Sequence, residues 1–261
     1  ATVNKEFIHR IAVTPGTRLA ILKGPENLRI SKEGILHWIP TSPEIGNQTV
    51  QIELQEKEQT SLYQMKIFVN SEPIISYRPN LREYVNFNEE FSFVFRSFDQ
   101  NINQDLYWSL KGPRGMEQNN HAIKWKASEP DYVFYTLSLT DQIDTTEFNG
   151  MLYVNDIPKI TSTPPQYMKL GDTLNYTIIV EDINKKSAFN MQEQNDHIYF
   201  LETSPKEMIL QKNKLTWIPK SEDIGPHQVK VTATDGLSPA EQSFTLFIND
   251  QPRIISGNEL K

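Results

Sequence analysis

The stretch "GILHWIPTSPEIGNQTVQI", residues 34–52, recurs later in the chain as "NKLTWIPKSEDIGPHQVKV", residues 213–231. Eight residues within fifteen positions keep both their identity and their spacing: Leu36, Trp38, Ile39, Pro40, Ser42, Ile45, Gly46 and Val50 return as Leu215, Trp217, Ile218, Pro219, Ser221, Ile224, Gly225 and Val229. Chance does not keep so many identities in register, so the chain contains an internal repeat.

A degenerate third copy lies between these two. In "HAIKWKASEPDYVFYTLSL", residues 121–139, Ile123 and Trp125 hold the places of the Leu and the Trp, whereas the Ile-Pro and Ile-Gly pairs are lost. Each copy is followed by an apolar residue, an Asn, two variable residues, a Pro and a short apolar run: "IFVNSEPIIS" (67–76), "LYVNDIPKITS" (152–162) and "LFINDQPRIIS" (246–256). The period is about 90 residues, the size of a small domain.

This period predicts three domains. They cover residues 1–72, 73–157 and 158–251, and residues 252–261 start a further repeat or form a tail. The third repeat opens with "PKITSTPPQYMK" (158–169), whereas the first begins almost at once with "EFIHRIAV" (6–13). We therefore expect the first domain to lack its first strand and the chain to be an excerpt from a longer array; the alternative is a natural N-terminus with a shorter first domain.

Apolar residues alternate with polar ones in every repeat. Phe91, Phe93 and Phe95 do so in the second repeat, and residues 174–180 do so in the third. A period of two indicates strands with one buried and one wet face. Several such strands, separated by Pro, Asn, Asp and Gly, favour a two-sheet sandwich. We predict an all-β fold of three tandem Ig-like or cadherin-like Greek-key β-sandwiches in an elongated array.

The repeated phrase has a structural role in this interpretation. Trp38, Trp125 and Trp217 each follow an apolar residue two positions earlier, which places them on the inward face of a strand. The next Pro ends the strand because it has no N–H to donate. The Ile-Gly pair then forms the return, with the Ile buried and the Gly allowing the bend. The alternative is an exposed Trp that stacks on a sugar, and the alternation favours the core.

The third repeat resembles the cadherin-like domains of the dystroglycan type, which are Ig-like β-sandwich repeats of surface proteins. The resemblance rests on Leu215, Trp217, Pro219, Ile224, Gly225, Val229, Val231, Ala233, Asp235 and Gly236, and on the exit Asn249, Asp250 and Pro252. The first repeat keeps the Trp-Ile-Pro and Ile-Gly pairs, and the second keeps mainly its Trp and its exit. The resemblance implies an extracytoplasmic location (cell surface, secreted or periplasmic). It implies no activity, because such domains serve as spacers, adhesive units and appendages to enzymes.

Composition excludes several classes of function. Asp and Glu number 33 against 26 Lys and Arg, without a basic stripe, so nucleic acid is not an expected partner. No run of eighteen apolar residues could span a membrane. The chain has no Cys, no G-x-S-x-G and no H-E-x-x-H, and no pair of carboxylates is marked out for glycosidase chemistry. We expect no enzyme and no required cofactor, and the lack of Cys favours a bacterial surface array.

The resemblance also suggests a calcium site, since cadherins bind Ca²⁺ between domains. The linker analogue is Asn155-Asp156, the segment Asp182-Ile183-Asn184 resembles the D-x-D of cadherins, and Asp235 follows in "TATDG". These five candidate metal ligands are Asn155, Asp156, Asp182, Asn184 and Asp235. A poorer set at the preceding junction is Asn70, Glu72, Asp99, Asn101 and Asp141. Calcium needs six to eight oxygens, and the cadherin Asp-Arg-Glu has no counterpart here. The alternative is that Asp182 and Asp235 cap turns.

Three functions remain open on the sequence. The first is a non-catalytic spacer or scaffold of a larger exported or cell-surface protein, whose partners are other repeats of the same chain. The second is an adhesin segment that binds a carbohydrate or a protein. The degenerate "SLKGPRGMEQNNHAIKW" (109–125) is where such a site is expected. The third is an accessory part of an exported enzyme or of an envelope assembly.

An elongated row is directly testable in solution. Short exits that contain Pro leave neighbouring domains little freedom, so they should meet end to end. Small-angle scattering should give a radius of gyration well above the roughly 18 Å of a compact protein of this length. A compact value would contradict the array.

Overall fold

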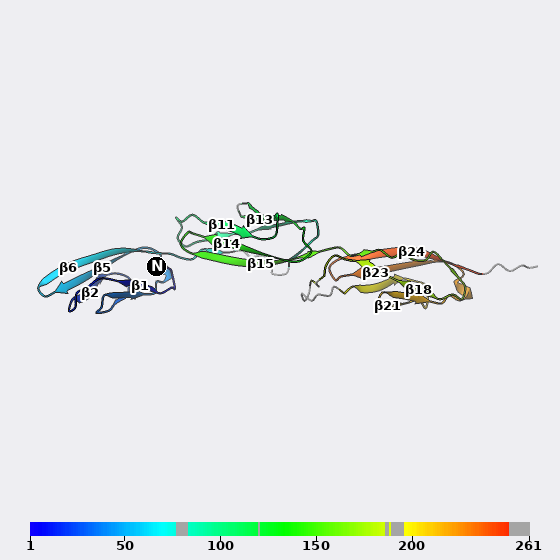
Figure 1. The fold of residues 1–261 in the computed structure, drawn as a ribbon, viewed down its shortest axis with the longest axis horizontal. Helices are drawn as coiled ribbons and strands as arrows, with labels where there is room; N and C mark the ends of the chain where they lie inside the picture. The colour runs from blue at the N-terminus through cyan, green and yellow to red at the C-terminus, as the bar shows by residue number, and fades with distance from the viewer. Residues whose placement is uncertain (77–82, 120, 186–187, 189–195, 251–261) are drawn as a thin grey trace, which may run out of the picture. The chain divides into compact units, whose positions relative to one another are not determined.

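The structure, a computed structural model, describes residues 1–76, 83–119, 121–185, 188 and 196–250, and its regular elements are β-strands and two short 3-10 helices (Figure 1). The strands of every sheet come from one of three stretches, 7–69, 74–155 or 159–249. The 3-10 helices are η1 (Ser42–Glu44) and η2 (Ser221–Asp223). None of the described helical segments could cross a membrane.

The third stretch is the most complete sandwich. One sheet has the order β17 (Tyr167–Lys169), β24 (Pro239–Asn249), β23 (Gly225–Thr234) and β20 (Ile198–Thr203), and β17 runs parallel to β24. The other sheet has the order β18 (Leu174–Thr177), β22 (Lys214–Trp217) and β21 (Ile209–Gln211), next to the pair β16 (Lys159–Ile160) and β19 (Val180–Glu181). This division of strands is that of an Ig-type Greek-key sandwich.

The first stretch repeats this plan. Its sheets have the orders β1 (Phe7–Arg10), β4 (Ile35–Trp38), β3 (Arg29–Ile30) and β2 (Arg18–Lys23), β5 (Gly46–Glu56), β6 (Gln59–Val69). Where the third sandwich pairs β17 with β24, the first has a single parallel bridge between Thr2 and Asn70. Among the described residues, the first sandwich has no counterpart of β16.

The middle stretch has the same strand order. Its larger sheet runs β11 (Tyr107–Lys111), β14 (Asp131–Thr140), β15 (Thr145–Asn155), β8 (Glu83–Asn86), with β8 parallel to β15. Its other sheets are β12 (Glu117–Asn119), β13 (Ala122–Lys126), β9 (Glu90–Val94) and the pair β10 (Ser97–Phe98), β7 (Ile74–Ile75). The all-β prediction is therefore confirmed.

The chain forms two compact units, and both include part of the middle stretch. The first comprises Ala1–Leu81, Ser92–Trp125 and Phe134–Gly150, and the second comprises Arg82–Phe91, Lys126–Val133 and Met151–Lys261. The boundaries of the three predicted domains stay predictions. The predicted tail, residues 252–261, lies outside the described residues.

The predicted tryptophans lie in the core. Trp38, Trp125 and Trp217 have exposed fractions of 0%, 2% and 3%. Phe7 pairs with Trp38 across β1 and β4, as Leu174 pairs with Trp217 across β18 and β22. The repeated phrase thus supplies the same core residue in the same strand of the first and third sandwiches.

The prediction for the Ile of the Ile-Gly pair was wrong. Ile224 is 50% exposed and Ile45 is only half-buried. The return is made by η1 and η2, which are stabilised at their starts by side chains: Thr41 N donates to Glu44 Oε2 (2.7 Å), and Lys220 N donates to Asp223 Oδ2 (2.8 Å). The 3-10 turn itself reverses the chain, so the Ile need not enter the core. The glycines do adopt positive φ, +92° at Gly46 and +123° at Gly225.

Alanine substitutions at two neighbouring positions of the phrase should differ sharply in their effect on the stability of the protein. Trp38→Ala or Trp217→Ala leaves a cavity in its own sandwich and should lower the free energy of unfolding by about 3–5 kcal/mol. Ile39→Ala and Ile218→Ala are matched controls, because these side chains are exposed. They should change it by less than about 0.5 kcal/mol. Urea unfolding of the four variants measures both. Equal effects at Trp and Ile would refute the core assignment.

Candidate cation sites at the strand exits

The last strand of a sandwich leads into a fully buried Asn. Asn70 follows β6 and Asn155 ends β15, and both are 0% exposed. Each backbone carbonyl accepts a hydrogen bond from a turn near the start of the same sandwich, from Val3 N at 2.8 Å and from Phe87 N at 2.6 Å. The two exits are therefore fixed in the same way.

A second Asn from the following repeat clamps each exit. The Oδ1 atom of Asn101 accepts from Ser71 N at 2.7 Å, and its Nδ2 donates to Val69 O at 3.1 Å. Asn184 does the same to Asp156 N at 2.6 Å and to Val154 O at 2.8 Å. A side-chain amide carries both an acceptor oxygen and a donor nitrogen. It can therefore form the hydrogen bonds that a neighbouring strand would otherwise form with the exit backbone.

Four aspartates complete the frames at the two exits. Asp99 Oδ1 accepts from Asn101 N at 2.7 Å, and Asp182 Oδ1 accepts from Asn184 N at 2.8 Å. Asp235 Oδ1 accepts from the N–H groups of Leu237 and Ser238, both at 2.7 Å. Asp141 Oδ1 plays the same role in the first exit, toward Ile143 N and Asp144 N.

The structure thus brings together the residues that the sequence marks as candidate ligands. We call Asn70, Ser71, Asp99, Asn101 and Asp141 the first exit cluster, and Asn155, Asp156, Asp182, Asn184 and Asp235 the second exit cluster. Each cluster lies within one compact unit. Glu72 lies beside the first cluster, half-exposed and paired with Lys5. Sequence reasoning missed Asp131, whose Oδ1 accepts from Asn184 Nδ2 (3.2 Å) and Lys185 N (2.9 Å), because it lies in the part of the degenerate middle copy where the Ile-Pro and Ile-Gly pairs are lost.

Each cluster contains buried oxygen atoms without a hydrogen-bond partner in the described structure. They are Asn70 Oδ1 and Asp99 Oδ2 in the first, and Asn155 Oδ1 and Asp235 Oδ2 in the second. A buried acceptor left unpaired costs about 1–3 kcal/mol, so such atoms call for an explanation. Turn capping, the alternative for Asp182 and Asp235, accounts for the Oδ1 atom of each. It does not account for Asp235 Oδ2 or Asn155 Oδ1.

The electrostatics of both clusters favour a cation. Burial raises the pKa of Asp99; the N–H of Asn101 opposes this, and the charge of Asp141 adds to it. In the second compact unit, burial raises the pKa of the Tyr153 phenol, and the carboxylates of Asp131, Asp182 and Asp235 raise it further. A negative potential therefore surrounds this buried hydroxyl, and a cation would relieve it.

The atoms that the two clusters offer to a cation are oxygens. No three His, Cys, Asp or Glu side chains within the described residues are grouped to hold a metal ion. Zinc and similar metals need such a group. Calcium also accepts amide, backbone and water oxygens. In the second cluster Asn155 and Asp235 each offer a buried oxygen without a hydrogen-bond partner.

The two clusters differ in the partners of the exit Asn side chain and in the basic residue that lies nearby. Asn70 Nδ2 donates to Asp141 Oδ2 (2.7 Å) and to Asp144 Oδ2 (2.9 Å). Asn155 Nδ2 instead reaches Ser238 Oγ at 3.2 Å. In the second cluster His197 Nε2 lies 3.1 Å from Asp182 Oδ2. The first cluster has a lysine, Lys5, at its edge.

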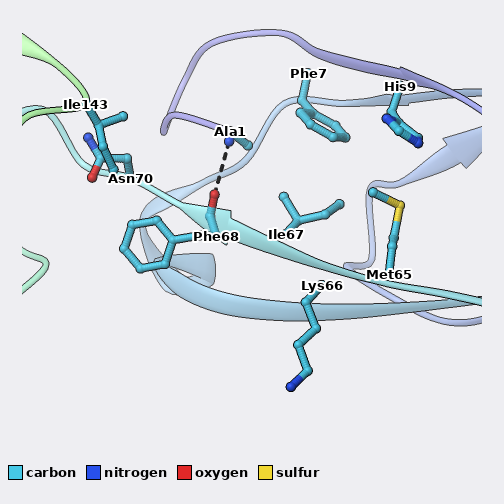
Figure 2. A pocket seen from close by; sticks show the side chains of 9 residues that line it. All are labelled: Ala1, Phe7, His9, Met65, Lys66, Ile67, Phe68, Asn70 and Ile143. Atoms are coloured by element: carbon cyan, nitrogen blue, oxygen red, sulfur yellow. Dashed lines mark hydrogen bonds between the residues drawn. The ribbon is translucent and has the colours of Figure 1, made fainter.

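An apolar pocket of about 420 Å³ lies at the edge of the first sandwich (Figure 2). Phe7, His9, Met65 and Ile67 line it, and the amino group of Ala1 donates to Phe68 O at 3.0 Å. By register against the repeated phrase, His9 holds the position of Tyr176. Tyr176 OH lies 2.7 Å from Ser162 Oγ, just after β16. The pocket therefore lies where the third sandwich has its β16 segment, and this accounts for it without a ligand.

The clamp should be the main support of each exit. Asn184→Ala removes both bonds to the exit backbone and leaves Val154 O and Asp156 N buried without partners. We expect a loss of about 2–4 kcal/mol in the free energy of unfolding, and the same for Asn101→Ala. Gln228→Ala is the control, because that exposed amide bonds only Thr245 Oγ1 among the hydrogen bonds resolved for it. A loss below about 1 kcal/mol for both Asn variants would show that the clamp is dispensable.

Comparisons with known proteins support the fold alone. No protein-family model matches the chain, and no curated protein sequence matches it. Among solved structures, the chain is similar to the I-band fragment I67–I69 of titin, with a TM-score of 0.53 and 11% identity over 96% of this chain and 94% of the other. It is also similar to extracellular domains 3–5 of Drosophila OTK, with a TM-score of 0.52 and 10% identity over 95% and 93%. Such likenesses show that the chain has the fold of tandem Ig-like domains.

Proposed function

We propose that the chain is a non-catalytic array of cadherin-like sandwiches that acts as a spacer, scaffold or adhesive segment of a larger exported or cell-surface protein, and that Ca²⁺ binds at its second exit cluster. The observation that carries this proposal is the recurrence of one hydrogen-bonded frame at two exits, each with buried unpaired oxygens. A frame repeated along a chain serves the geometry of an array rather than a reaction.

The second exit cluster has the charge that calcium prefers. Asp156 Oδ2 accepts from Ile183 N at 3.0 Å, which brings the carboxylate of the exit against the Asp182–Asn184 turn. Asp131, Asp182 and Asp235 lie close enough to one hydroxyl, that of Tyr153, to shift its pKa together. Like charges so close repel one another, and this repulsion opposes folding unless a counter-ion is present.

Asn155, Asp156, Asp182, Asn184 and Asp235 would hold the ion, and Asp131 would add charge from the side. Bound calcium would neutralise these carboxylates and join the exit strand to the turns of the next sandwich. The exit itself is short and contains Pro158. A bound ion would therefore remove most of its remaining freedom. Extracellular modules bind calcium with Kd values of about 10⁻⁴–10⁻³ M, which suits an extracytoplasmic array.

A second candidate is ligand binding by the third sandwich. Tyr167 and Phe247 lie stacked on neighbouring strands β17 and β24, with ring centroids 5.6 Å apart, and are 65% and 39% exposed. Exposed aromatic pairs are common anchors for glycans and proteins. This supports the adhesive form of the proposal, at a different place from residues 109–125. Loss of glycan-array binding on Tyr167→Ala would favour it.

Calorimetric titration of the chelator-treated chain tests the calcium proposal. We expect heat of binding and a rise in Tm, equivalent to about 2.7 kcal/mol at a calcium concentration 100 times Kd. Asp182→Asn with Asp235→Asn should abolish both effects. Asp223→Asn is the control, because that carboxylate caps η2. If millimolar Ca²⁺ gives no heat and no shift in Tm, these aspartates only cap turns.

A further inference from the structure

The same turn occurs near the start of each sandwich. In the first sandwich Val3 N donates to Asn70 O, Lys5 N donates to Thr2 O at 3.1 Å, and Asn4 has φ of 61°. In the middle stretch Phe87 N donates to Asn155 O, Glu89 N donates to Asn86 O at 3.0 Å, and Asn88 has φ of 66°. The two turns are the same, so Lys5 and Glu89 hold equivalent positions.

The third sandwich has this turn as well. Leu170 N donates to Asn249 O at 2.9 Å, Asp172 N donates to Lys169 O at 3.1 Å, and Gly171 has φ of 83°. The equivalent side chain is therefore Asp172. The turn supplies a carboxylate in two of its three copies and an ammonium only at Lys5.

The Lys5 ammonium is held by carboxylates of the first exit. Its Nζ lies 2.9 Å from Asp144 Oδ1 and 2.5 Å from Glu72 Oε1. Asp144 Oδ2 accepts from Thr2 Oγ1 and Asn70 Nδ2, both at 2.9 Å. Burial alone would raise the pKa of Asp144, but the hydrogen bonds from Asn70, Lys5 and Thr2 outweigh it and hold the pKa below its usual range. The Asp144 side chain is 14% exposed, whereas those of Lys5 and Glu72 are 54% and 49% exposed, so the ammonium lies at the surface and reaches inward to a mostly buried carboxylate.

The second exit differs in charge at both positions. Glu89 replaces Lys5, and its Oε1 accepts from Asn86 Nδ2 at 3.2 Å. Ser238 replaces Asp144, since it follows Asp235 by three residues as Asp144 follows Asp141. The first exit thus pairs a lysine with an extra aspartate, and the second has a glutamate and a neutral hydroxyl.

We propose that Lys5 is a tethered cation of the first exit cluster, so that this exit holds without a divalent metal while the second exit depends on one. An ammonium on the same chain is always present at the site, whereas calcium must be bound from solution. The calcium part rests on the proposed function. The Lys5 part stands on its own contacts with Asp144 and Glu72.

A reciprocal charge swap in the full chain tests this. Lys5→Glu gives the first exit the residue of the second, and calorimetry should then find a second calcium site per chain that Asp141→Asn removes. Glu89→Lys gives the second exit the residue of the first, and should raise its Kd for Ca²⁺ at least about tenfold. Lys57→Glu and Glu202→Lys make the same charge changes at exposed positions and should do neither.

The failures of the two proposals are distinguishable. Wild-type calcium binding that Asp141→Asn reduces would show a loaded first exit and overturn the Lys5 proposal, while leaving the calcium proposal intact. An unchanged number of sites in Lys5→Glu would overturn it as well. If the wild type binds no calcium, the calcium part of the proposed function fails. The role of Lys5 is then tested by measuring the Tm of variants in the presence of a chelator. Lys5→Gln should then lower Tm by about 2 °C or more, Lys57→Gln should not, and Lys5→Arg should restore it; an unchanged Tm in Lys5→Gln overturns the proposal.

Discussion

The side-chain amides of Asn101 and Asn184 hold the exits, and the rest of each exit cluster depends on them. Each amide bonds the backbone on both sides of a buried exit Asn. The exit strand ends at this point, so the backbone groups beyond it need partners that its own sheet does not supply. The Asn of the following repeat meets this need, and its hydrogen bonds couple one repeat to the next.

This arrangement brings carboxylates together, and the two exits differ in how the repulsion between these charges is relieved. Asp99 and Asp182 hold the backbone N–H groups of the clamp residues, and Asp141 and Asp235 close the adjacent hairpins. Carboxylates therefore gather wherever the frame is built. At the first exit, the Lys5 ammonium pairs with Asp144 and the Asn70 amide donates to Asp141, so groups of the chain itself stabilise part of this negative charge. At the second, the frame is the same, Glu89 stands at the position of Lys5, and we propose that calcium balances the charge of the carboxylates.

Much of this was predictable from sequence because the repeat encodes it. The Trp phrase, the alternation and the exit Asn recur at fixed spacing, and resemblance placed Asp182, Asn184 and Asp235 at one exit. What failed or was missed depends on local backbone. Ile224 was expected in the core, but the 3-10 turn before it reverses the chain. Lys5 lies outside the repeated phrase, and Asp131 lies in the degenerate part of its middle copy. The positive-φ turn at Asn4 and the start of β14 bring these two residues to the clusters. The clamping role of the amides depends on side-chain direction, which a pattern of residue types does not specify.

The central claim is that the frame at the second exit is built around a cation. The most direct test is a crystal structure of the chain grown with Ca²⁺, with anomalous scattering recorded to identify the metal. The account predicts a calcium peak about 2.3–2.6 Å from Asn155 Oδ1 and Asp235 Oδ2, and no peak at the first exit, where Lys5 Nζ remains on Asp144. An ordered second exit with water or nothing beside these two oxygens would contradict it.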